Sequence, residues 1–172
     1  MGSSHKKQGK IAINNAKKAK VFSKLVRLIQ VEAKKANGDV TSPGLASAIK
    51  KAYKENMPKD NVERAIKKAS DVGDTKPLMY EAYGPEGVGM IITALTDNTN
   101  RTGQEVKSIL SKNGGSLGAP GSVAWNFTQN EERDWIANMP IEIDSKAKEE
   151  LDMIIELLVD NDDVQDVYHS AT

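Results

Sequence analysis

The sequence predicts an α+β protein in which an N-terminal three-helix bundle is followed by a ferredoxin-like βαββαβ domain. Up to residue 70 the apolar residues recur at the spacing of amphipathic helices, and after residue 79 β-rich runs alternate with helical patterns. The net charge also changes sign between these two parts. We therefore expect a basic helical domain over residues 1–70, a polar linker over residues 71–78 and an acidic α+β domain over residues 79–172.

The basic part contains three helical patterns joined by short connections, which is typical of a helical bundle. The first runs from about Asn14 to Ala36 and ends at Asn37-Gly38, where glycine tolerates a left-handed cap. The second starts with Ser42 as N-cap and stops before Met57, and the third follows Pro58. The side chains expected in the core are Phe22, Leu25, Ile29, Ala33, Ala36, Leu45, Ala48, Ile49, Ala52, Tyr53, Val62, Ile66 and Ala69.

The acidic part contains the order of elements that characterises a split βαβ fold. It predicts a hairpin or bent strand pair around the turn at residues 84–87, and both later helices on one face of an antiparallel sheet. Val123, Trp125 and Phe127 alternate and are expected in the core. The two strands of the hairpin are expected over residues 80–83 and 88–96. The elements predicted after them are a helix over 101–113, strands over 122–127 and 139–143, a helix over 146–159 and a strand over 164–168.

Composition excludes several classes of protein. The 172 residues contain no cysteine, which rules out a disulfide framework, thiolate metal ligands and a cysteine nucleophile. The two histidines, His5 and His169, do not suggest a metal centre, and we expect no metal and no cofactor. No apolar run reaches the length of a membrane span and no signal peptide is recognisable, so we expect a cytoplasmic protein without a membrane partner.

The neutral total charge hides a sharp division. Residues 1–70 hold 17 Lys and Arg against 5 Asp and Glu, whereas residues 71–172 hold 7 against 19. The first 31 residues contain eight cations and no acid. A solvated lysine-rich surface is the alternative explanation, but surfaces adapted only for solubility mix both signs. The division therefore favours a polyanionic partner for the first half.

The candidate nucleic-acid-binding residues lie on one side of the first helix. At 100° per residue they fall opposite the apolar side, so one side packs and the other forms a cationic ridge. Such cations contact phosphates, which positions a protein on nucleic acid without reading its sequence. The ridge comprises Lys17, Lys20, Lys24, Arg27, Lys34 and Lys35, to which Lys6, Lys7 and Lys10 could add.

A secondary anion site is a further candidate, at the junction before the helix over residues 101–113. Asn98, Asn100 and Arg101 could hold an anion there, much as an acylphosphatase holds a phosphoryl group, although no glycine-rich cradle leads into this helix. The alternative is that the asparagines only cap the helix. No catalytic triad is supported around His169, and the aspartates of residues 160–166 do not fit a calcium loop.

Several segments resemble the YebC family: residues 16–25 and 56–66, YEAYGPEGVG, LTDNTNRT, NGGSLGAPGSVAWNF and DDVQDVYH. The resemblance implies a helical domain followed by two α+β domains, the third inserted into the second, and a bacterial cytoplasmic protein without catalysis or cofactor. It also implies nucleic-acid binding, either as a DNA-dependent regulator or in ribosome-associated translation. Two departures are evident: the family's tryptophan-containing opening is absent around His5–Ile13, and the inserted domain is missing near residues 128–138.

We therefore expect a non-enzymatic nucleic-acid-binding regulator of gene expression, most simply a ribosome- and RNA-associated translation factor. Ribosomal RNA is favoured because no helix-turn-helix with a base-reading side is evident and a lysine ridge suits recognition of shape and charge. The alternatives are a DNA-binding transcriptional regulator and, less well supported, an acylphosphatase-like enzyme acting through Arg101. No small-molecule substrate is expected.

Overall fold

The computed structural model describes the backbone of residues 2–172 and the side chains of residues 17–172. The chain divides into two compact units, the N-terminal unit Met1–Gly73 and the C-terminal unit Asp74–Thr172. The N-terminal unit holds 17 Lys and Arg against 6 Asp and Glu, a net charge of +11, and the C-terminal unit holds 7 against 18, a net charge of −11. The division of charge therefore coincides with the division of the fold.

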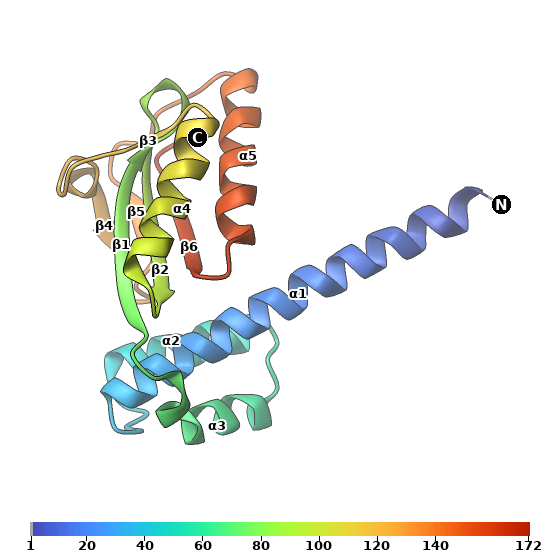
Figure 1. Ribbon diagram of the computed structural model, residues 1–172, viewed down its shortest axis with the longest axis vertical. Coiled ribbons are helices and arrows are strands. Elements are labelled where there is room, and N and C mark those ends of the chain that lie inside the picture. Colours follow the sequence, from blue (N-terminus) through green and yellow to red (C-terminus); the bar gives the residue numbers. More distant parts are fainter. Residues whose placement is uncertain (1) are drawn as a thin grey trace. The chain divides into compact units, whose positions relative to one another are not determined.

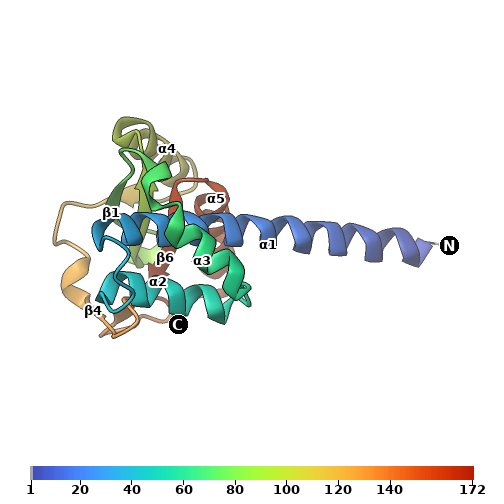
Figure 2. The same ribbon diagram turned by 90° about the horizontal axis from the view of Figure 1, so that it is seen from below.

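The N-terminal unit is helical. Its elements are α1 (Gly2–Lys35), α2 (Pro43–Lys54), α3 (Lys59–Lys67) and a short 3-10 helix, η1 (Ala69–Val72). α2 and α3 lie along the C-terminal half of α1 (Figures 1 and 2). The core between them contains the apolar side chains predicted for it, except Tyr53. Its buried members also include Met57 and Ala65, which were not predicted, beside Leu25, Ile29, Ala33, Leu45, Ala48, Ala52 and Val62.

Local sequence sets the ends of these helices. α1 begins well before the predicted Asn14 but ends where expected, because Asn37 (φ 50°) and Gly38 (φ 79°) adopt left-handed conformations that turn the chain. Pro43 occupies the first turn of α2, where its missing N–H leaves no backbone acceptor unsatisfied. The left-handed Asn56 then separates α2 from α3.

The C-terminal unit is built on an antiparallel sheet in the order β3-β1-β2-β6. β1 (Lys76–Tyr83) and β2 (Gly89–Thr96) pair over their full lengths, from Lys76 opposite Thr96 to Tyr83 opposite Gly89. The short β3 (Ser116–Leu117) pairs with β1, and β6 (Val164–His169) pairs with β2. Strand β1 thus begins at Lys76, inside the linker expected over residues 71–78.

The two faces of this sheet are covered differently. Helices α4 (Thr99–Lys112) and α5 (Ser145–Asp160) cover one face, as predicted (Figure 1). Met90 and Ile92 of β2 point into that core, whereas Ile91 points to the other face and packs against Val123 and Phe127. That second face is covered by the hairpin of β4 (Phe127–Gln129) and β5 (Trp135–Ala137), which occupies the region where we expected the family's inserted domain to be missing.

The strand order differs from the predicted ferredoxin-like order. The sheet is antiparallel as predicted, but a βαββαβ chain passes through a helix between its first two strands, whereas here β1 and β2 follow one another as a hairpin. The reason is the tight turn at Pro85–Gly87, where Glu86 (φ 57°) and Gly87 (φ 76°) reverse the chain and bring the two strands into direct register. The sequence allowed a hairpin here, but the βαββαβ assignment treated the pair as a single strand.

Two strands predicted from alternation are wrong. Residues 122–127 are not extended: Val123 is helical in conformation, Ala124–Asn126 form a 3-10 turn, and only Phe127 enters a strand. The alternating pattern therefore does not apply, and Trp125, expected in the core, is 65% exposed. The strand predicted over residues 139–143 is reduced to one parallel bridge between Ile141 and Ala171.

A buried carboxylate explains why residues 121–124 turn instead of extending. Glu81 of β1 is 8% exposed, and its carboxylate accepts backbone N–H groups from Gly121 (2.6 Å), Val123 (3.1 Å) and Ala124 (2.6 Å). A strand cannot present three such N–H groups to one carboxylate, because they alternate in direction. Burial raises the pKa of Glu81, but the three N–H groups outweigh it and hold that pKa below its ordinary value.

We expect Glu81→Gln to destabilise the C-terminal unit by about 1–3 kcal/mol at neutral pH, because an amide NH2 group then faces backbone donors without an acceptor. Since the folded pKa of Glu81 is lowered, its contribution is complete above its ordinary pKa near 4.5 and is lost as the pH falls through the folded value. Denaturant unfolding followed at pH 7 and in acid measures both effects.

Glu149→Gln is the matched control, since Glu149 is exposed on α5 and its neutralisation should leave the free energy of unfolding unchanged. Equal unfolding free energies for the Glu81→Gln and Glu149→Gln proteins would contradict the role given to Glu81.

Candidate nucleic-acid interface

Helix α1 of the N-terminal unit carries the predicted cationic ridge on the side away from its core residues. Lys17 is exposed, and Lys20, Lys24 and Arg27 are half-buried on the same side. From residue 17 to residue 27 this side extends about 15 Å, at 1.5 Å per residue. Lys18 lies on the core side, with its ammonium group 5.6 Å from the ring centre of Phe22.

The remaining two ridge residues have partners at the end of α1. Lys34 donates from Nζ to the carbonyl oxygen of Gly73 at 2.7 Å, and Lys35 Nζ lies 3.8 Å from Glu32 Oε1. Both lie in the last turn of the helix, where cations also interact favourably with the helix dipole. The ridge is interrupted before them by Val31, which lies on the same side and is 4% exposed. It therefore divides into a continuous group over residues 17–27 and a separate pair at the end of the helix.

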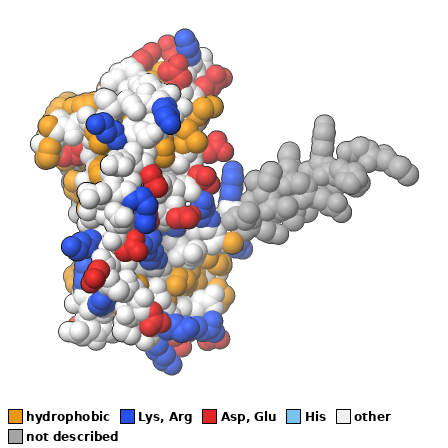
Figure 3. All heavy atoms as spheres, in the orientation of Figure 1, with side chains coloured by type: hydrophobic (Ala, Val, Ile, Leu, Met, Phe, Trp, Pro, Cys, Tyr) orange, Lys and Arg blue, Asp and Glu red, His pale blue; other side chains and the backbone are white. Residues whose placement is uncertain are grey.

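The candidates Lys6, Lys7 and Lys10 lie outside the residues whose side chains the structure describes. The visible face in Figure 3 shows Lys and Arg side chains beside acidic ones on both units, with several acidic side chains along the α5 side of the C-terminal unit. The described helices carry further cations that the sequence reasoning did not select.

Helix α2 contributes a feature that the sequence analysis missed. Tyr53 was expected in the core, but it is 45% exposed and lies beside Lys50 and Lys54 on the outside of the unit. Lys50 and Lys54 are four residues apart, and Tyr53 directly precedes the second of them. This spacing could have indicated that Tyr53 lies beside a row of lysines on the surface of α2. The assignment failed because Tyr53 lies at the edge of the apolar stripe, where helical periodicity does not separate core from surface.

The secondary anion site has a different organisation from the one expected. Arg101 Nη2 lies 3.0 Å from Asp163 Oδ2 and 3.1 Å from Asp97 Oδ1, so two carboxylates already surround its charge. Hydrogen bonding to Asp163 is the main cause that raises the pKa of Arg101. Asn98 is the N-cap of α4 and accepts the N–H of Arg101 at 3.1 Å. The geometry therefore favours the capping alternative over anion binding.

Asp163 is the buried member of this cluster. It is 6% exposed, its Oδ2 also accepts a hydrogen bond from Thr102 Oγ1 at 2.9 Å, and its backbone carbonyl accepts the N–H of Leu95 at 2.8 Å. It thereby ties the start of α4 and the end of β2 to the segment that leads into β6. In the sequence Asp163 is one of several aspartates over residues 160–166, and composition alone does not distinguish the one that is buried.

Within residues 2–172 no helix combines the length and hydrophobicity that crossing a membrane requires. Among the described side chains, no group of three or more histidine, aspartate or glutamate residues is arranged to hold a metal ion.

Comparison with known proteins agrees with the resemblance seen in the sequence. Residues 3–72 match the TACO1/YebC protein N-terminal domain, and residues 75–132 match the TACO1/YebC second and third domain. The chain belongs to the TACO1/YebC family. The two matches meet at residues 72–75, which is also where the two compact units meet in sequence.

Relatives in this family bear the name probable transcriptional regulatory protein. That of Borrelia turicatae is 54% identical over 118 residues, which cover 66% of this chain and 48% of the relative. That of Thermosipho africanus is 43% identical over 162 residues, which cover 90% of this chain and 63% of the relative. The chain thus spans about half the length of the first relative and under two thirds of the second.

A solved structure shares the fold. The crystal structure of a conserved hypothetical protein, Aq1575, from Aquifex aeolicus superposes with a TM-score of 0.76 at 27% sequence identity, covering 91% of each chain. The α+β architecture of this TACO1/YebC family member is therefore found in an experimental structure.

We expect Asp163→Asn to lower the free energy of unfolding by about 1–3 kcal/mol, because Arg101 and Thr102 then face a buried group that accepts more weakly. Asp97→Asn removes the other carboxylate beside Arg101, but Asp97 is 63% exposed and its loss should change stability by less than about 1 kcal/mol. Denaturant unfolding of the two variants compares their free energies of unfolding and shows which carboxylate contributes more to stability. If Asp97→Asn were the more destabilising, the central role of Asp163 would be wrong.

Proposed function

We propose that this TACO1/YebC family member is a non-enzymatic regulator of gene expression that binds nucleic acid through its N-terminal unit, with structured RNA of the ribosome as its preferred partner. The observation that carries the proposal is the opposite net charge of the two units, +11 and −11. A polyphosphate is attracted to the first and repelled by the second, so the charges fix which part of the chain makes the contact.

The ridge formed by Lys17, Lys20, Lys24 and Arg27 is the proposed phosphate-binding surface, and Lys34 and Lys35 form a separate cationic pair at the end of α1. Cations along one side of a straight helix can follow a sugar–phosphate backbone without contacting bases. Binding of this kind recognises charge and shape, which suits folded RNA.

The exposed residues of α3 carry both signs of charge. α2 and α3 are consecutive short helices, and a helix-turn-helix would place the second of them in the major groove. The exposed residues of α3 include Asp60 and Glu63, and Glu63 lies 3.8 Å from Lys59. They also include Lys59, Arg64 and Lys67, so the charge of α3 does not by itself decide between duplex DNA and RNA.

A DNA-binding transcriptional regulator is the second candidate, and the name of the relatives from Borrelia turicatae and Thermosipho africanus favours it. The two candidates differ in a measurable way. A transcriptional regulator should select one duplex sequence at physiological salt, whereas phosphate contacts alone give duplex binding that is independent of sequence and weakens steeply with salt. The acylphosphatase-like alternative loses support, because Asp97 and Asp163 lie where an anion would have to approach Arg101.

We expect Lys17→Glu, Lys20→Glu and Lys24→Glu together to abolish co-sedimentation of the protein with ribosomes, since three phosphate contacts become repulsive. For the unmodified protein, the logarithm of RNA affinity should fall with the logarithm of salt concentration by about 0.7–0.9 for each phosphate contacted. Sedimentation at several salt concentrations measures both.

The matched control is the triple variant Lys107→Glu, Lys112→Glu and Lys146→Glu, which makes the same change in net charge on exposed residues of the C-terminal unit. It should co-sediment nearly as the unmodified protein does. Equal loss in both triple variants would show that total charge matters and not the ridge, and the proposal would fail.

A further inference from the structure

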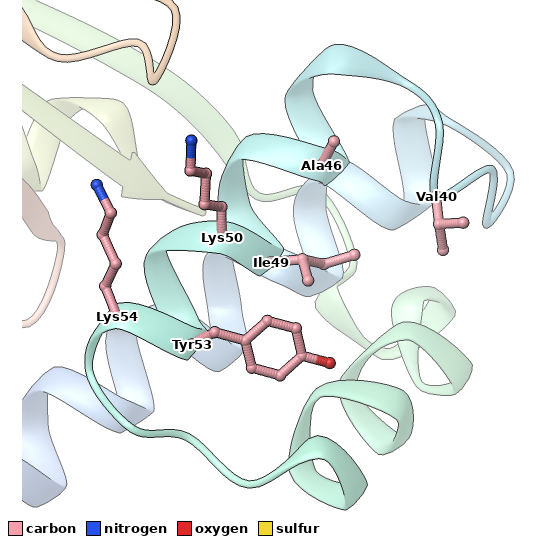
Figure 4. A pocket seen from close by; sticks show the side chains of 6 residues that line it. All are labelled: Val40, Ala46, Ile49, Lys50, Tyr53 and Lys54. Atoms are coloured by element: carbon pink, nitrogen blue, oxygen red, sulfur yellow. The ribbon is translucent and has the colours of Figure 1, made fainter.

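The outer side of α2 carries a shallow groove of about 560 Å³ within the N-terminal unit. It lies next to the connection between α1 and α2 and is open to solvent (Figure 4). Its lining is Val40, Ala46, Ile49, Lys50, Tyr53 and Lys54.

The lining separates into an apolar part and a cationic part. Ile49 and Tyr53 are four residues apart and form one row on α2, and Lys50 and Lys54 form the neighbouring row with the same spacing. Figure 4 shows the two lysine side chains extending in parallel from one side of α2, while Ile49 and Tyr53 point to the adjacent side. Two ammonium groups thus border an apolar surface that contains an aromatic ring.

Packing against the core accounts for only part of this arrangement. The residues by which α2 fills the core are Leu45, Ala48 and Ala52, with Ile49 partly buried against them, whereas Tyr53 is 45% exposed and Val40 is 53% exposed. The sequence of α2 contains three lysines and no acid, so the charged side chains of this helix are all cationic. An exposed ring beside cations matches the way that proteins hold single-stranded nucleic acid, in which a base stacks on the ring and lysines contact the backbone.

We propose that this groove binds an unpaired nucleotide of RNA, with its base stacked on Tyr53 and its flanking phosphates held by Lys50 and Lys54. Within a duplex both faces of a base are covered by its neighbours, so only a base in a loop, bulge or single strand can reach the ring. The inference rests on the proposed function and adds to it: the ridge of α1 supplies affinity for any polyphosphate, and the groove of α2 selects RNA that exposes a base.

The test measures binding of the full chain to a short labelled single-stranded RNA and to a blunt RNA duplex of the same length. Tyr53→Ala should weaken binding to the single strand by about five- to one-hundred-fold, which is the effect of losing one stacked base, and should leave duplex binding unchanged. Tyr53→Phe keeps the ring and should retain affinity. Met153→Ala is the control for an exposed side chain on the C-terminal unit, 57% exposed, and should change neither affinity.

A second variant tests the cationic row. Lys50→Ala with Lys54→Ala should reduce the salt dependence of single-strand binding by about 0.7 for each phosphate that the variant no longer neutralises, while circular dichroism confirms that the helices are retained.

The possible results separate the inference from the proposed function. If the unmodified chain binds neither RNA at low salt, both are overturned. If it binds RNA and Tyr53→Ala binds the single strand as tightly as before, the inference alone is overturned and the groove is left for a protein partner. Equal weakening on single strand and duplex would also overturn it, because in a blunt duplex only the two terminal base pairs expose a face on which a ring could stack.

Discussion

Ile29 of α1 and Leu45 of α2 are both fully buried, and the apolar core around them holds the helices of the N-terminal unit together. This packing decides which sides of α1 and α2 remain in solvent. Because most apolar residues of each helix lie on one side, most of its lysines lie on the other, where they gather in rows. The positive surface of the unit is therefore a consequence of how its core is formed. Loss of that core would disperse the cations and, with them, the proposed site.

The C-terminal unit uses its charges in the opposite way. Two of its carboxylates are buried and bind inward, Glu81 to the backbone of residues 121–124 and Asp163 to Arg101 and Thr102. They shape the loop beside β1 and fasten α4 to the sheet, while the acids of α5 stay exposed. A surface of this sign repels phosphate. The two units thus differ in how they use charge: the cations of the N-terminal unit lie on its surface, whereas two carboxylates of the C-terminal unit are buried and stabilise its fold.

Amphipathic periodicity predicted α2, α3, α4 and α5 to within a few residues, because each helix buries one side and its ends carry recognisable capping residues. The strands were less predictable. Trp125 follows an alternating pattern, yet the carboxylate of Glu81, far earlier in the chain, turns that segment away from the sheet. The engagement of Lys34 with Gly73 and the exposure of Tyr53 likewise depend on tertiary packing. Sequence therefore located the basic half that contains the proposed site, but not the residues within it that are available to a ligand.

The central claim is that nucleic acid contacts the N-terminal unit alone. Ultraviolet crosslinking of the intact protein to bound RNA, followed by mass spectrometry of the crosslinked peptides, tests this directly. The account predicts that the crosslinks lie within residues 1–73, on the solvent-facing sides of α1 and α2. Crosslinks concentrated within residues 74–172 would contradict it, because RNA would then be held by the unit whose net charge repels it.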